Sequence, residues 1–145
     1  MIEGVKLYPL KIIEVPKGNI FHAIKATDEG FEGFGEAYFS SIEPGAVKGW
    51  KRHNRIPLNL IVPYGAIRFV IYDNRDGSPS FGQYEDITLS PANNYQRLYI
   101  APGLWMAFQG VANEVSLLLD IIPLPHNPAE ADRLDIHDIP YSFNK

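Results

Sequence analysis

The sequence predicts an all-β fold of the sandwich, jelly-roll or small-barrel type, and three observations carry that prediction. Short segments rich in β-branched and aromatic residues recur along the chain, and several alternate apolar and polar side chains as half-buried strands do. Twelve prolines and twelve glycines are spread over the whole length and separate these segments. Helix signals are weak except near the C-terminal end. A chain of 145 residues is expected to form one domain, residues 1–145.

The expected strands follow one another at close, regular spacing. In chain order they are VKLYPLKIIEV, NIFHAIKA, GEAYFSSI, PLNLIVPYG, AIRFVIYDN, FGQYEDITLS, QRLYIAPG, LWMAFQGV and EVSLLLDII. In AIRFVIYD, Ile67, Phe69 and Ile71 share one face of the strand, while Arg68 and Tyr72 share the other. After the last strand, Asn127 is a candidate N-cap and Pro128 a candidate first helical residue, so one short C-terminal helix is expected.

Composition excludes several classes of function. The net charge of −4 disfavours general nucleic-acid binding, which needs a basic face. With no cysteine, neither a disulfide framework nor a thiolate metal site is possible. No stretch approaches the ~20 apolar residues of a membrane span, and the first residues lack the pattern of a secretory signal. A cytoplasmic protein without membrane contact is the expectation.

The basic stretch PGAVKGWKRHNR has informative spacing. Gly45 is followed after five residues by Lys51-x-His53, and Gly65 comes twelve residues later. This resembles the first motif of the cupins, in which two histidines at i and i+2 point into a barrel and bind a metal. Lys51 replaces the first histidine, and Met106 stands where the second motif supplies another. A protonated lysine cannot bind a metal, so no metal is expected.

A second resemblance covers residues 28 to 140. The runs YDNRDGSPSFGQY and LSPANNYQRLYIAPG, together with GEAYFSSIEPGAVKGWKRH and PHNPAEADRLDIHD, resemble the dTDP-4-dehydrorhamnose 3,5-epimerase family. The resemblance implies a cupin jelly roll (a double-stranded β-helix) that forms a homodimer, with N-terminal strands pairing with the partner. It also implies a nucleotide-diphosphate sugar as ligand, specifically a dTDP-linked 4-keto-6-deoxy sugar, and no cofactor.

The sequence departs from this family at the chemistry. The family's R-G-L-H motif, whose histidine is the base, reads Lys48-Gly49-Trp50-Lys51 here. The family's acid tyrosine falls near Asp120, and its second histidine near Met106. The related dTDP-sugar 3,4-ketoisomerases use a His-x-His pair with an upstream tyrosine. His53 matches the second of those histidines, and Tyr38 lies near the tyrosine.

Four residues are therefore candidates for proton transfer. His53 needs no pKa shift to act as a base at neutral pH. Lys51 could act as a base if its pKa fell by ~3 units, and otherwise it would be a charged donor to a diphosphate or an enolate. Asp120 interrupts an apolar strand, so it is either an acid/base group or the ion-pair partner of Lys51. Tyr38 is the alternative to Asp120.

Further polar and aromatic residues are candidates for substrate binding. Arginine and lysine suit phosphate oxygens, and Arg68 would contribute if its face of the strand lines the barrel. Lys48 is out of phase with Lys51 unless a bulge lies near Gly49. Asn59 would contact a sugar hydroxyl or fix a neighbouring backbone segment. Aromatic side chains would stack on the thymine base or belong to the core. The candidates are Lys48, Arg55, Asn59, Arg68, Tyr72, Arg97, Trp105 and Met106.

Two functions from different classes stay open at this point. The first is an isomerase or epimerase that removes a proton alpha to the ketone of a nucleotide sugar without a metal. The second is a carbohydrate-binding cupin that has lost the chemistry and kept the pocket.

Overall fold

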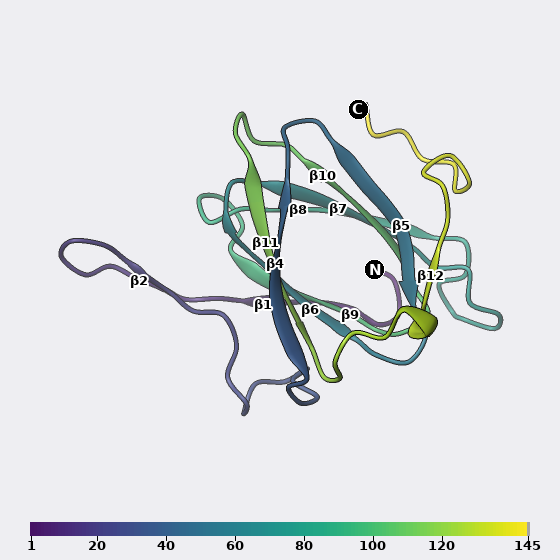
Figure 1. The fold of residues 1–145 in the computed structure, drawn as a ribbon, viewed down its shortest axis with the longest axis horizontal. Coiled ribbons are helices and arrows are strands. Elements are labelled where there is room, and N and C mark those ends of the chain that lie inside the picture. The colour runs from purple at the N-terminus through teal and green to yellow at the C-terminus, as the bar shows by residue number, and fades with distance from the viewer. Residues whose placement is uncertain (145) are drawn as a thin grey trace.

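The computed structural model describes residues 1–144, and its regular secondary structure is antiparallel strands apart from one short 3-10 turn (Figure 1). One sheet has the order β1-β9-β6-β11-β4 and the other the order β12-β5-β10-β7-β8. Strands of the first sheet are β1 (Val5–Pro9), β9 (Gln96–Ile100), β6 (Leu58–Tyr64), β11 (Ser116–Ile122) and β4 (Glu36–Ile42). Strands of the second are β12 (Ala131–Arg133), β5 (Val47–His53), β10 (Trp105–Gly110), β7 (Ile67–Tyr72) and β8 (Tyr84–Leu89). The predicted jelly roll is confirmed by this topology.

The main core lies between the two sheets and is built by period-2 alternation. Ile67, Phe69 and Ile71 of β7 are fully buried there, as are Leu60 of β6 and Leu98 of β9. A second, smaller apolar cluster lies on the outer face of the second sheet. It is covered by the C-terminal segment, which runs past β5 in Figure 1. Its members include Trp50, Val70, Trp105, Ala107 and Ile139.

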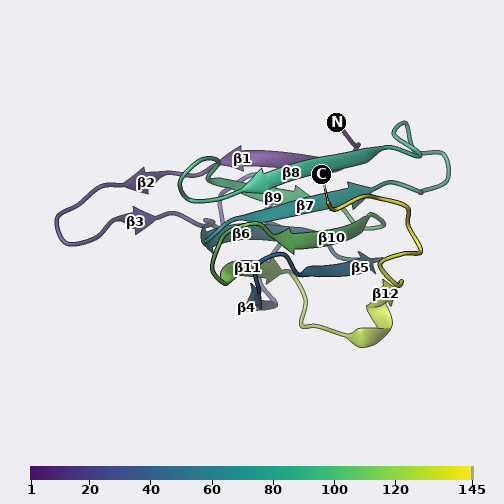
Figure 2. The ribbon, with the colours of Figure 1, turned by 90° about the horizontal axis from the view of Figure 1, so that it is seen from above.

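A two-stranded ribbon projects away from both sheets. It consists of β2 (Ile12–Ile13) and β3 (Ile20–Phe21), and it extends to one side in both Figure 1 and Figure 2. Strand β1, which precedes the ribbon in the chain, is not part of it, because β1 pairs with β9 of the same chain in the first sheet. No helix within residues 1–144 is long and apolar enough to span a membrane.

The expected C-terminal helix is only one turn long. Asn127 caps it as predicted, because its side chain accepts a hydrogen bond from Ala129 N, and Pro128 begins a 3-10 turn that ends at Glu130. The chain then becomes β12, which pairs with β5. The expected helix is limited to this single turn because pairing with an available sheet edge competes with local helix propensity.

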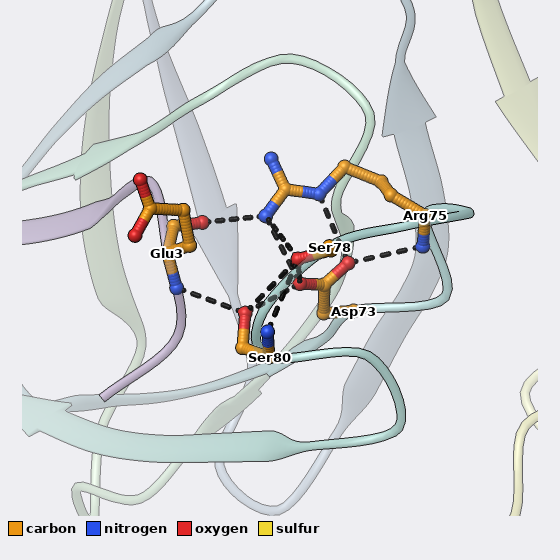
Figure 3. A network of polar contacts seen from close by, with 5 residues as sticks. All are labelled: Glu3, Asp73, Arg75, Ser78 and Ser80. Atoms are coloured by element: carbon orange, nitrogen blue, oxygen red, sulfur yellow. Dashed lines mark hydrogen bonds and ion pairs between the residues drawn. The ribbon is translucent and has the colours of Figure 1, made fainter.

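The most specific stretch of the sequence, DNRDGSPS, forms a closed polar network in the loop after β7 (Figure 3). Asp73 is fully buried and accepts hydrogen bonds from Arg75 Nε at 2.9 Å, from Ser78 Oγ and from Ser80 Oγ at 2.6 Å. Arg75 also donates to the Glu3 carbonyl, and Glu3 N donates to Ser80 Oγ. The network therefore fastens the N-terminal end of the chain to this loop.

Candidate functional site

A cavity of about 190 Å³ lies between the two sheets, on the side where β4 is the edge of one sheet and β5 and β12 form the edge of the other. Residues from six strands line it. All four candidates for proton transfer are among them, together with Lys48 and Met106. Two lining polar residues were not predicted: Ser40 and Arg133. The cavity is smaller than the ~300–1,000 Å³ of pockets that bury drug-sized ligands, so it has room for a single ring rather than a nucleotide.

A bulge in β5 gathers the basic residues on one face of the strand. The pairing of β5 with β10 matches Met106 with Lys51 but Phe108 with Lys48, so two residues of β5 oppose Ala107 alone. Gly49 permits this arrangement because its φ is 144° and an added Cβ would lie 2.5 Å from the Ala107 Cβ. Lys48 therefore lines the cavity in phase with Lys51, as predicted for a bulge at Gly49.

His53 forms a dyad with Glu130, a residue that the sequence had not indicated. The His53 side chain is 6% exposed, and its Nδ1 lies 2.6 Å from Glu130 Oε1. Burial lowers the pKa of His53, against the raising effect of the hydrogen bond to Glu130. The ring is thus neutral at pH 7, with the proton on Nδ1, and Nε2 is left as an acceptor.

Glu130 is itself fixed by the backbone. Its Oε2 accepts hydrogen bonds from the N–H groups of Arg55 at 2.7 Å and Ile56 at 3.3 Å. Burial would raise the pKa of Glu130, but the bonds from Arg55 N and from His53 lower it below its usual value. A carboxylate is the form that holds a neutral histidine in one tautomer.

Asp120 and Tyr38 form a second pair across β11 and β4, where they are directly opposite in register. Tyr38 Oη donates to Asp120 Oδ2 at 2.9 Å, and Asp120 Oδ1 has no hydrogen-bond partner among the described residues. Burial raises the pKa of Asp120 to about 6, against the lowering effects of Tyr38 and Lys51. Burial and the Asp120 charge also raise the pKa of Tyr38. The pair can therefore hold and release one proton near neutral pH.

Lys51 lies between Met106 of β10 and Arg133 of β12 in the sheet register. It makes no ion pair with Asp120 within residues 1–144, where Tyr38 is instead the partner of that carboxyl group. Burial and the neighbouring Arg133 lower the pKa of Lys51, while Asp120 and Glu130 act in the opposite direction. Of the two alternatives for Asp120, an acid/base group or the ion-pair partner of Lys51, the ion pair is not the one the structure has.

Three predicted substrate-binding residues lie on the outer face of the second sheet. Arg68 faces away from the barrel, because Ile67 and Phe69 beside it fill the core, and its Nη2 pairs with Asp86 at 2.7 Å. Tyr72 stacks on Tyr84 with ring centroids 4.6 Å apart. Trp105 lies under the Arg52 guanidinium. The orientation of Arg68 into the barrel was therefore wrong, and the aromatic residues belong to the outer cluster.

The other three lie away from the cavity as well. Asn59 and Arg97 are buried on the opposite face of the first sheet, where Asn59 donates to Gly30 O and accepts from Arg97. Arg97 Nη2 donates to Glu29 O at 2.6 Å. Asn59 was expected either to contact a sugar hydroxyl or to fix a neighbouring backbone segment, and in the structure it fixes a backbone segment. The Arg55 side chain is exposed beyond the end of β5.

The described residues contain no group of three or more His, Cys, Asp or Glu side chains placed to hold a metal ion. The residues lining the cavity also lack the ligand set of a cupin metal, because Lys51 and Met106 occupy the positions of two histidines. A lysine ammonium has no lone pair for a cation.

Comparison with known proteins identifies relatives over almost the whole chain. Residues 19–142 match the family model described as dTDP-4-dehydrorhamnose 3,5-epimerase. The chain is 28% identical to the probable low-salt glycan biosynthesis epimerase Agl13 of Haloferax volcanii, over 97% of this chain and 88% of that protein. It is 25% identical to the spore coat polysaccharide biosynthesis protein SpsL of Bacillus subtilis, over 99% of this chain and 96% of that protein.

Solved structures share the same fold. A dTDP sugar isomerase from Desulfovibrio desulfuricans G20 superposes with a TM-score of 0.93 at 35% identity, covering 97% of this chain and 91% of that one. ChmJ, a 3'-monoepimerase from Streptomyces bikiniensis solved in complex with dTDP-quinovose, gives 0.82 at 21% identity over 94% of this chain and 72% of that one. At that identity the second likeness concerns the fold alone.

Proposed function

The chain belongs to the dTDP-4-dehydrorhamnose 3,5-epimerase family, and from this premise we propose that it epimerises or isomerises a dTDP-linked 4-keto-6-deoxy sugar. The observation that carries the proposal is the convergence of two proton carriers on one small cavity. One is the His53–Glu130 dyad on β5, and the other is the Tyr38–Asp120 pair on the facing edge of the first sheet.

The reaction class follows from the chemistry of these groups. His53 Nε2 is a neutral base suited to remove a proton alpha to a ketone, and Asp120 near its pKa can return a proton to carbon or oxygen. The cationic side chains of Lys48 and Arg133, which line the same cavity, favour the negative charge of an enolate. Return of the proton to the other face gives an epimer, and return to another atom gives an isomer.

A cavity of about 190 Å³ has no room for the nucleotide, so in this proposal only the sugar ring enters it, beside His53 and Asp120. The diphosphate and the thymidine would then bind at or beyond the mouth of the cavity, where Lys48 is exposed. A homodimer and a cytoplasmic location are part of the proposal, and light scattering of the purified protein tests the first.

A binding module without chemistry is the competing function, and the site argues against it. The unpartnered Asp120 Oδ1 suits either function, since a hydroxyl group of a bound sugar can donate to it. A pocket that only binds a sugar has no use, however, for a histidine held as a neutral base by a carboxylate that backbone N–H groups fix in place.

The test is incubation with dTDP-4-keto-6-deoxyglucose in deuterated water, followed by NMR and mass spectrometry. We expect deuterium at a carbon next to the ketone, at a rate that falls in the His53→Ala variant. Calorimetric binding of the nucleotide sugar with no deuterium exchange would overturn the proposal in favour of the binding module.

A further inference from the structure

The two lysines that line the cavity are in different chemical situations. Lys48 Nζ donates to Ser41 O at 2.6 Å and lies 6.0 Å from the centroid of the Phe108 ring, so it has a backbone acceptor. Lys51 Nζ has neither a hydrogen bond nor an ion pair within residues 1–144. A half-buried amine without an acceptor is not stabilised in its charged form.

Arg133, the cross-strand neighbour of Lys51, makes the environments of the two lysines differ further. Arg133 is directly opposite Lys51 in the register of β5 and β12, and both side chains line the cavity. Like charges directly opposite on adjacent strands destabilise each other. An arginine is always charged, so the repulsion acts on the pKa of the lysine. Burial and Arg133 lower the pKa of Lys51 accordingly. Desolvation and a neighbouring cation are the two devices that make a lysine nucleophilic.

Asp120 and His53 supply the other groups that carbonyl chemistry with an amine requires. Asp120 Oδ1 is buried and without a partner among the described residues, so a proton on it is available to an oxygen in the cavity. His53 lines the same space from the next inward position of β5 and presents Nε2 as an acceptor. Nucleophile, acid and base therefore face one cavity of about 190 Å³.

We propose that Lys51 forms a Schiff base with the ketone of the sugar, and that epimerisation or isomerisation proceeds through an enamine rather than an enolate. The inference rests on the proposed function, since it requires a keto sugar in this cavity. It assigns Lys51 a covalent role that differs from both a general base and a fixed ammonium.

The steps balance as follows. The lone pair of Nζ attacks the carbonyl carbon, and the carbonyl oxygen takes the proton of Asp120 to give a carbinolamine. Nζ loses a proton to the Asp120 carboxylate, which protonates the hydroxyl group so that it leaves as water and a C=N⁺ bond forms. His53 Nε2 then removes the alpha proton. The C–H electron pair becomes a C=C bond, and the electrons of C=N⁺ return to nitrogen.

Protonation of the enamine carbon and attack of water on the resulting iminium regenerate the ketone and the amine. No oxidant or reductant enters the cycle. The iminium makes the alpha proton far more acidic than the ketone does, which offsets the modest basicity of a buried neutral imidazole. Lys48 and Arg133 are then free to bind anionic groups of the substrate.

Borohydride trapping tests the covalent step. The full-length protein is incubated with dTDP-4-keto-6-deoxyglucose and sodium cyanoborohydride at neutral pH, and its intact mass and peptide map are recorded. We expect a mass gain equal to the substrate less one oxygen atom, on the peptide that contains Lys51. The Lys17→Arg variant, which removes a lysine from the turn between β2 and β3, keeps the label, and Lys51→Arg loses it.

The Lys51→Arg variant also separates the covalent role from an electrostatic one. Arginine keeps the positive charge but cannot form the Schiff base, so solvent deuterium exchange falls on the order of 10³-fold while circular dichroism shows a folded protein. Retention of a tenth or more of the exchange rate would overturn the inference, as would exchange without labelling of Lys51 in the unmodified protein. In either case the proposed function stands, whereas absence of any exchange contradicts the function itself.

Discussion

Two buried aspartates in this fold have opposite environments. Asp73 is 0% exposed in the loop after β7, and both of its oxygens accept hydrogen bonds, from Arg75, Ser78 and Ser80. Asp120 is 6% exposed on β11, with Tyr38 on one oxygen and no partner for the other among the described residues. Despite burial, these hydrogen bonds lower the pKa of Asp73, whereas burial raises that of Asp120 to about 6.

The difference between Asp73 and Asp120 distinguishes a buried carboxylate that stabilises the fold from one that can take part in chemistry. A buried carboxylate whose every acceptor site is filled lowers the free energy of the fold and has no capacity left for a ligand. A buried carboxyl group with an empty acceptor site raises that free energy, and only a ligand or a proton relieves it. The DNRDGSPS stretch is thus a structural signature, while the chemistry lies in the less conspicuous SLLLDII strand.

The largest expected effect is on turnover and comes from Asp120→Asn. The amide keeps the shape and the bond from Tyr38 but cannot transfer a proton, so the rate of substrate-dependent deuterium exchange falls about 10³-fold, or about 4 kcal/mol in activation free energy. Urea unfolding at pH 8 should show no loss of stability, because a neutral group replaces a buried charge. A folded variant that keeps the exchange rate would remove Asp120 from the machinery, whereas a loss of stability at pH 8 would show that the carboxylate supports the fold.

The matched change Asp73→Asn should reverse this pattern. It leaves Arg75 without its carboxylate in a buried network, and breaking such a pair by removal of one partner costs roughly 3 kcal/mol of unfolding free energy. The kcat of the remaining folded protein should equal that of the parent, since the loop is outside the cavity. Unfolding in urea and active-site titration measure the two quantities, and a loss of kcat at full stability would contradict the contrast.

The two aspartates should also differ in how pH changes stability. Asp120 has a folded pKa of about 6 and an unfolded pKa of about 3.9, so between these values the folded state binds the extra proton. Its contribution therefore destabilises the protein as pH rises from about 4 to 6, by up to about 3 kcal/mol. The unfolding free energy of Asp120→Asn minus that of the parent should increase over this interval. A constant difference would mean that Asp120 has an ordinary pKa.

Sequence reasoning located the inward face of β5 and the apolar-strand aspartate because both depend on local pattern. Period-2 alternation places Lys51 and His53 on one face, and a carboxylate between Leu119 and Ile121 is conspicuous in any sequence. The sequence could say only that Lys48 would share the face of Lys51 if a bulge lay near Gly49. Whether the bulge exists depends on the close approach of Ala107, which is far away in the chain.

Sequence reasoning failed where the identity of a partner depends on tertiary pairing. Arg68 was a plausible ligand residue until Asp86 and the C-terminal segment were seen to cover it. Glu130 lies in the segment for which only a short C-terminal helix was expected. The strand that follows it, β12, places its carboxylate against His53 instead. Glu130 and His53 are 77 positions apart in the sequence, so no local pattern indicates that the two side chains interact.

The smallest of the expected effects concerns Glu130, which acts through His53 rather than on the substrate. In Glu130→Gln the amide oxygen can still accept from His53 Nδ1, but the charge is gone, and loss of such an outer partner costs about 10-fold in rate. Because Glu130 raises the pKa of His53, its removal should also move the acidic limb of the kcat/KM profile to lower pH. Asp132→Asn is the control on the adjacent strand β12: it weakens the exposed pair with Arg52 and leaves the profile in place. A Glu130→Gln variant that loses rate without a shift of the limb would make Glu130 a purely structural link between β12 and β5.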